Sequence, residues 1–194
     1  MKMCARFFIL SSGLLLAMTA LALPGDRQLP VNIEADRNRG SLGANEIIYL
    51  GNVRITQGTL TIEGDEVTVY RSDENEIRRM VAIGNSEPAW ISDQLEEDQP
   101  YTHLDGEVVI YDAEEGMISA QGNARLQQGR NLVTAHFIRF YVDDEEFESD
   151  QTAPDGTTGD RVRMCLIRDD ATATETEEPH GQRIERPASC EAIR

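Results

Sequence analysis

An internal repeat constrains the fold of this chain more than any other feature of its sequence. The segment 51–70, GNVRITQGTLTIEGDEVTVY, aligns without a gap to the segment 122–141, GNARLQQGRNLVTAHFIRFY, with six identities. The apolar positions stay in phase: Ile55, Ile62, Val67 and Val69 match Leu126, Val133, Ile138 and Phe140. The same alignment, extended towards the N-terminus, sets Ile33 to Asp36 over Leu104 to Glu107. A unit repeated in this way is expected to stack on its copy and share one core with it.

The region 31–142 consists of short runs that are typical of β-strands. Branched or aromatic residues recur at close to period two in 53–55, 60–62, 67–70, 108–111 and 138–141, and Gly, Asn and Asp separate these runs. A weaker third Gly-Asn step, Gly84-Asn85, lies between the two aligned segments, as expected if the unit is repeated in halves. The pattern predicts an all-β domain of roughly a dozen strands.

Alternation within each hairpin predicts which side chains face inward. The inward set is Val53, Ile55, Val67, Val69, Ala124, Leu126, Ile138 and Phe140, whereas Arg54, Thr68, Arg125 and Arg139 point outward. Repeated strand pairs of this kind predict two sheets, or one rolled sheet, with one face buried. A stack without a closing partner leaves strand edges at both ends, where other chains can add strands.

The N-terminal segment 1–22 has the pattern of a secretory signal peptide. Lys2 and Arg6 precede an apolar stretch over 7–18, and Ala20-Leu21-Ala22 has the small-x-small form of a cleavage site. The stretch is shorter than the roughly 20 residues that span a bilayer. We expect cleavage near Ala22 and an exported, soluble protein; the alternative is a retained membrane anchor.

The chain is strongly acidic, with a formal net charge of −17, and removal of the segment 1–22 would make it more negative. Such a protein repels nucleic acid and anionic membrane surfaces, so nucleic acid is excluded as a partner. An anionic ligand would have to be held mainly by something other than a basic patch.

The composition changes after position 150, which divides the chain into a signal peptide (1–22), a β-domain (23–150) and a polar tail (151–194). We expect the tail to be mostly disordered, with one strand-like element near 162–167. Cys165 and Cys190 remain after export into a compartment that oxidises thiols. They could form a disulfide or stay as two free thiols.

Residues that would carry enzymatic chemistry are not grouped in this sequence. His103, His136 and His180 lie far apart, and neither a nucleophile elbow nor a glycine-rich phosphate loop is present. We therefore predict no catalytic residue, no metal site and no cofactor. The pair Asp105 and Glu107 leaves one alternative, an enzyme acting on envelope glycans, although in so acidic a chain a solvated strand face is the preferred explanation of the pair.

Four segments resemble a known family in their order and residues. They are LPVNIEADR (29–37), IIYLGNVRITQGTLTIEGDEVTVY (47–70), GNSEPAW (84–90) and YDAEEGMISAQGNARLQQGRNLVTAHFIRFY (111–141). Together they are similar to the lipopolysaccharide-transport periplasmic family, also called the organic-solvent-tolerance-like N-terminal family. The resemblance covers about 29–145. It implies a periplasmic, twisted, open β-jellyroll built from antiparallel hairpin repeats, with no enzymatic activity.

The resemblance also implies a ligand and partners. Lipopolysaccharide would be carried from the inner to the outer membrane, with its acyl chains in the apolar interior. Copies would join head to tail, and edge strands would pair with inner-membrane-anchored and outer-membrane members of the transport machinery. A different jellyroll member of the same bridge is the other assignment within this family.

The resemblance and the alternation together select ten candidate lipopolysaccharide-binding residues, although ordinary core packing would produce the same pattern. They are Val31, Ile33, Ile55, Val67, Val69, Ile91, Tyr111, Leu126, Ile138 and Phe140. Either Trp90 or Ile91 must face inward, but not both.

Overall fold

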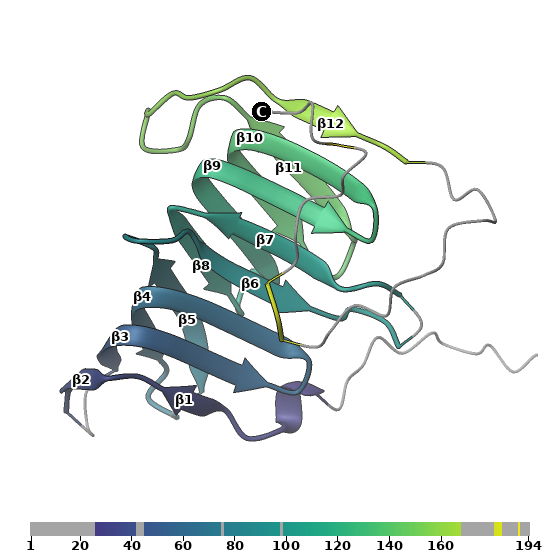
Figure 1. The fold of residues 1–194 in the computed structure, drawn as a ribbon. Helices are drawn as coiled ribbons and strands as arrows, with labels where there is room; N and C mark the ends of the chain where they lie inside the picture. The colour runs from purple at the N-terminus through teal and green to yellow at the C-terminus, as the bar shows by residue number, and fades with distance from the viewer. Residues whose placement is uncertain are drawn as a thin grey trace, which may run out of the picture.

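Twelve β-strands make up most of the chain that the computed structural model describes, which is residues 26–41, 45–74, 76–97, 99–167, 181–183 and 190 (Figure 1). After a short 3-10 helix (Asp26–Gln28), the first half contains β1 (Asn32–Glu34), β2 (Arg37–Gly40), β3 (Glu46–Gln57), β4 (Leu60–Arg71), β5 (Ile77–Ile83) and β6 (Ala89–Asp93). The second half contains β7 (Thr102–Gly106), β8 (Val108–Asp112), β9 (Met117–Gln128), β10 (Asn131–Tyr141), β11 (Glu146–Asp150) and β12 (Arg163–Cys165). This confirms the all-β prediction.

The four long strands β3, β4, β9 and β10 each take part in two sheets. The beginning of β3 pairs with β2 and its end with β1, while the beginning of β4 pairs with β6 and its end with β5. In the same way, β9 pairs with β8 and then β7, and β10 with β12 and then β11. We call the layer containing β1, β6, β7 and β12 the first sheet, and the layer containing β2, β5, β8 and β11 the second sheet. Figure 1 shows the two layers facing each other.

The aligned Gly-Asn steps are the places where two long strands bend from one sheet into the other. Gly51 and Asn52 in β3 have φ values of 79° and 43°, and Gly122 and Asn123 in β9 have 78° and 50°. Such positive values favour glycine and asparagine. The sequence predicted these steps as separators between short strands, but they lie inside continuous strands.

The same hydrogen bonds form at both bends. The backbone N–H of Asp36 donates to the Gly51 carbonyl at 3.0 Å, and that of Glu107 donates to the Gly122 carbonyl at 3.0 Å. Asn52 donates its side-chain amide to Asp36, and Asn123 donates to Glu107, each at 3.0 Å. The sequence repeat is therefore also a structural repeat, in which β1–β4 correspond to β7–β10.

Both sheets are open at their ends. Within the described residues, β1 and β2 form one edge and β11 and β12 the other, and no strand closes the roll by joining the two. β12 falls within the predicted strand-like element near 162–167, and it extends the first sheet past the domain boundary that we placed at position 150. The predicted signal peptide (1–22) and most of the tail lie outside the described residues. None of the described segments forms a helix that could cross a bilayer.

Candidate functional site

The space between the two sheets is apolar along the whole roll, because cross-strand rows of apolar side chains from both sheets point into it. Strand pairing aligns the row of the first sheet as Ile33, Ile55, Ile62, Ile91, Leu104, Leu126, Val133 and Met164. It aligns a row of the second sheet as Gly40, Ile47, Val69, Met80, Tyr111, Ile118, Phe140 and Phe147. The two rows face each other and belong largely to a single core cluster.

The structure brings all ten candidate ligand-binding residues into this interior. Eight of them are buried core residues: Ile55, Val67, Val69, Ile91, Tyr111, Leu126, Ile138 and Phe140. Val31 and Ile33 are half-buried and pack against the same cluster near the β1 edge. Their shared location is thus as expected, and their contact with a lipid stays a prediction.

The choice between Trp90 and Ile91 is settled by the fold. Ile91 belongs to the core cluster, whereas Trp90 faces the outer side of the first sheet and donates its indole N–H to Glu63 at 2.9 Å. The sequence could not decide this because both residues are large and apolar.

The interior is filled by the protein's own side chains but reaches the surface at the β11–β12 end. Ile55, Leu104 and Ile138 are almost completely buried, while Phe147 and Met164, the last members of their rows, are 38% and 46% exposed. Two surface hollows of about 390 and 300 Å³ are lined mainly by polar residues, among them Arg79 in the first and Asp150 of β11 in the second. The apolar rows come to the surface at Phe147 and Met164 instead, and we call this exposed pair the apolar mouth.

The outer face of the first sheet is polar and carries ion pairs between neighbouring strands. Arg54 pairs with Glu63, and Arg125 pairs with Asp105 at 2.6 Å. Burial raises the pKa of Asp105, and the Arg125 guanidinium opposes this shift. Sequence reasoning placed both arginines outward but did not find their partners, because the pairing depends on strand register.

Asp105 and Glu107 do not form a catalytic pair. Asp105 forms an ion pair with Arg125 on the outer face of the first sheet. Glu107 lies at the bend of β9 and accepts a hydrogen bond from the Asn123 side-chain amide. In the described part of the chain, no three His, Cys, Asp or Glu side chains are grouped closely enough to hold a metal ion.

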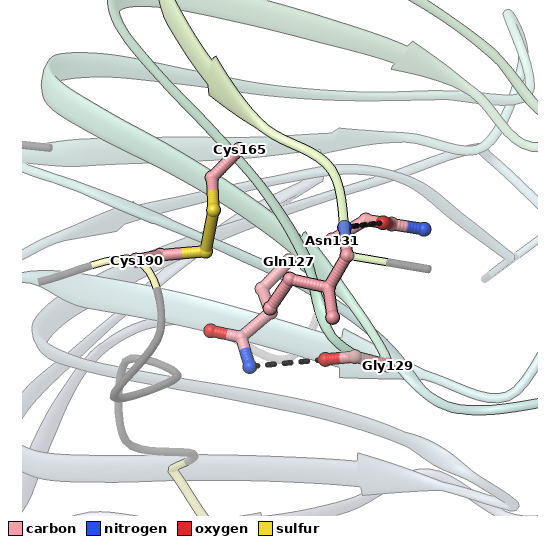
Figure 2. Close-up of a disulfide and its surroundings, with 6 residues drawn as sticks. Gln127, Gly129, Asn131, Cys165 and Cys190 are labelled. Carbon is pink, nitrogen blue, oxygen red and sulfur yellow. Dashed lines mark hydrogen bonds between the residues drawn. A yellow bond between two sulfur atoms is a disulfide. The ribbon is translucent and has the colours of Figure 1, made fainter. Parts of the chain in front are cut away.

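The two cysteines of the tail are joined by a disulfide that attaches Cys190 to the edge strand β12. The S–S distance between Cys165 and Cys190 is 2.08 Å, and their Cα atoms are 5.9 Å apart. Figure 2 shows the bond beside the β9–β10 turn, where the Asn131 side chain accepts the Ile167 N–H at 3.2 Å. The disulfide lies on the outer side of the roll, away from the apolar interior.

Comparison with known proteins identifies the family of this chain. A family model described as LptA/(LptD N-terminal domain) LPS transport protein matches residues 32–146. The chain belongs to this LptA/LptD family. The match spans β1 to the start of β11, which includes both copies of the repeat and nearly all of the apolar interior. The LptA/LptD family is one of transport proteins, so the chain is a transport protein and not an enzyme.

Curated relatives and a solved structure agree with the LptA/LptD assignment. Lipopolysaccharide export system protein LptA of Escherichia coli (strain K12) is 27% identical over 150 residues, 76% of this chain and 79% of the relative. LptA of Haemophilus influenzae is 24% identical over 164 residues, 84% and 91% of the two chains. The crystal structure of Pseudomonas aeruginosa LptH, described as the periplasmic component of the lipopolysaccharide transport device, superposes with a TM-score of 0.67 at 20% identity. It covers 75% of this chain and 100% of that one, so the open β-jellyroll fold is shared.

Proposed function

We propose that this chain is a periplasmic bridge protein that carries lipopolysaccharide from the inner to the outer membrane. The observation that carries the proposal is the continuous apolar interior, which runs from the β1–β2 edge to an exposed apolar mouth at β11–β12. The relatives are named as lipopolysaccharide export proteins. The segment 1–22 would direct export and be removed near Ala22.

Acyl chains are the part of lipopolysaccharide that this interior suits. Each buried methylene contributes about 0.8 kcal/mol, so a few acyl chains supply enough free energy without any charged contact. Sugars and phosphates would stay in water, which fits the strongly acidic character of the chain. We propose the ten candidate residues as the acyl-chain contacts.

The lipid would enter at the ends of the roll, since the middle of the core is already filled. Phe147 and Met164 stand at one end, and Val31 and Ile33 at the other, all of them partly accessible. No strand joins the two edges among the described residues, so the sheets can separate at a mouth and admit a chain between them.

The open edges support head-to-tail assembly, and the internal repeat supplies a template for the joint. Inside the chain, β5 pairs with β8 and β6 with β7. Since β1 and β2 correspond to β7 and β8, the β11–β12 edge of one copy can receive the β1–β2 edge of the next in the same way. Such a joint would make the interiors continuous. The same edges would pair with the inner-membrane-anchored and outer-membrane members of the machinery.

A competition experiment with purified protein tests acyl-chain recognition. Labelled lipopolysaccharide should bind, lipid A should displace it, and fully deacylated lipopolysaccharide should not. Phe147→Asp, which places a charge in the mouth, should weaken binding, whereas Glu148→Asp on the opposite face should not. If the deacylated molecule displaces the label as well as lipid A does, the site recognises sugar or phosphate and the proposal fails.

A further inference from the structure

We infer that the joint between two copies of this chain is selected by charge, with Arg37 and Arg39 of one copy facing Asp150 and Glu148 of the next. This inference rests on the proposed head-to-tail assembly and adds its register and the residues that make it specific. The partner is a second copy of this chain.

The register follows from the internal joint between β5 and β8. There, Val81 lies opposite Ile110 and Ile83 lies opposite Val108. The repeat aligns Arg39 with Ile110 and Arg37 with Val108, so these arginines take the same places on the incoming copy.

The other side of the joint is placed by pairing with the long strands. Val81 pairs with Thr68, and Glu148 pairs with Arg139, which the repeat aligns with Thr68. By the same comparison, Asp150 takes the position of Ile83, because their partners Phe137 and Glu66 are also aligned by the repeat. The apolar pairs of the internal joint are thus replaced by two pairs of opposite charge.

A third pair appears in the first sheet. Trp90 lies between Glu63 and Asp105 in the internal joint. Arg163 of β12 lies opposite Thr134, which the repeat aligns with Glu63, so Arg163 takes the place of Trp90. The repeat also aligns Glu34 with Asp105, so Glu34 of the next copy takes the place of Asp105. All three pairs join an arginine to a carboxylate.

These charges are accessible in the single chain. Arg37 and Arg39 are exposed on the edge strand β2 and form no ion pair within the described residues. Glu148 contacts Arg139 at 3.3 Å, and Asp150 accepts the Thr152 N–H at 2.8 Å. Both acidic residues are nevertheless exposed at the surface. Two β2 edges brought together would repel each other, as would two β11 edges, so the charges favour the head-to-tail joint over either alternative.

Paired charge reversals test whether these charges select the joint. Arg37→Glu with Arg39→Glu sets two acidic side chains against Glu148 and Asp150 of the next copy, and Glu148→Arg with Asp150→Arg sets two basic side chains against Arg37 and Arg39. Light scattering at concentrations where the wild-type chain assembles should show each variant as a monomer. An equimolar mixture should assemble again, because every joint then pairs opposite charges. Arg79→Glu, on the internal strand β5, is the control and should assemble normally.

The outcomes separate this inference from the proposed function. If each variant assembles alone, or if the mixture stays monomeric while the wild type assembles, charge does not select the joint. The proposal of head-to-tail assembly is not contradicted by either result. A wild-type chain that remains monomeric at every concentration removes the joint itself. Lipopolysaccharide binding by the monomeric variants reports separately on the interior.

Discussion

At the scale of single residues, the bends of the long strands depend on glycine. Gly122 has a φ of 78°, and a Cβ added there would lie 2.5 Å from the Glu107 side chain. We expect Gly122→Ala to lower the free energy of unfolding by about 1–3 kcal/mol in urea denaturation. Gly156→Ala is the control, because its φ is 88° but nothing lies within 4 Å of the added atom. Equal losses in the two variants would mean that close packing at the bend contributes nothing.

Asp155 is a second residue whose local contacts make a measurable difference. The Thr157 hydroxyl and N–H donate to it at 2.6 and 2.8 Å, and with Gln121 they lower the pKa of Asp155 to about 2. Because the pKa is lowered in the folded state, the stabilisation is present above the ordinary pKa of 3.8 and is lost as the pH falls towards 2.

Carboxyl NMR titration should therefore show that Thr157→Val moves the pKa of Asp155 back towards 3.8, because a hydrogen bond to the charged form is lost. Thr158→Val, next to it in the chain, should leave the pKa of Asp155 in place. An ordinary pKa for Asp155 in the unmodified protein would contradict these contacts.

At the scale of elements, the Asp26 side chain attaches the N-terminal 3-10 segment to the β3–β4 turn. Asp26 accepts the Thr59 N–H at 2.8 Å and the Thr59 hydroxyl at 2.7 Å. We expect Asp26→Ala to release the segment before β1, so that amide exchange quickens in Asn32–Glu34 while β5 and β8 keep their protection. Asp73→Ala, on a distant turn, is the control. Unchanged exchange in β1 would show that the edge strand is held by its pairing with β3 alone.

Much of the element pattern could be predicted, because alternation and the repeat are local features of the sequence. The inward set, with Ile55, Val69 and Phe140 among its members, follows from period two and faces the core. The continuity of β3 and β9 through Gly-Asn could not be predicted, since the same dipeptide also ends strands at turns. The strand register could not be predicted from the sequence either. The pairing of Arg125 with Asp105 depends on that register, so it could not be predicted.

Contacts of the tail were beyond sequence reasoning for a different reason. Arg54 and Gly181 are far apart in the chain, and neither local pattern nor charge indicates that they meet. The two cysteines expected to remain after removal of the segment 1–22 were the one available signal, and they left both pairing and free thiols open. The structure pairs Cys165 with Cys190.

At the scale of the whole molecule, the proposed assembly would make the repeat, the open edges and the apolar interior one section of a longer conduit. Two half-rolls are joined inside the chain by β5–β8 and β6–β7, and the same kind of joint can be formed again at either end. Residues on the inner face should therefore meet lipid, and their immediate neighbours on the outer face should not.

Photocrosslinking in living cells tests this central claim most directly. A photoreactive phenylalanine analogue would replace Phe147 or Ile33 on the inner face, and Glu148 or Glu34, the next residue in each strand, on the outer face. We predict lipopolysaccharide adducts at Phe147 and Ile33 and none at Glu148 and Glu34. Normal amounts of protein without an adduct at either inner position, or equal adducts on both faces, would contradict a lipid-carrying interior.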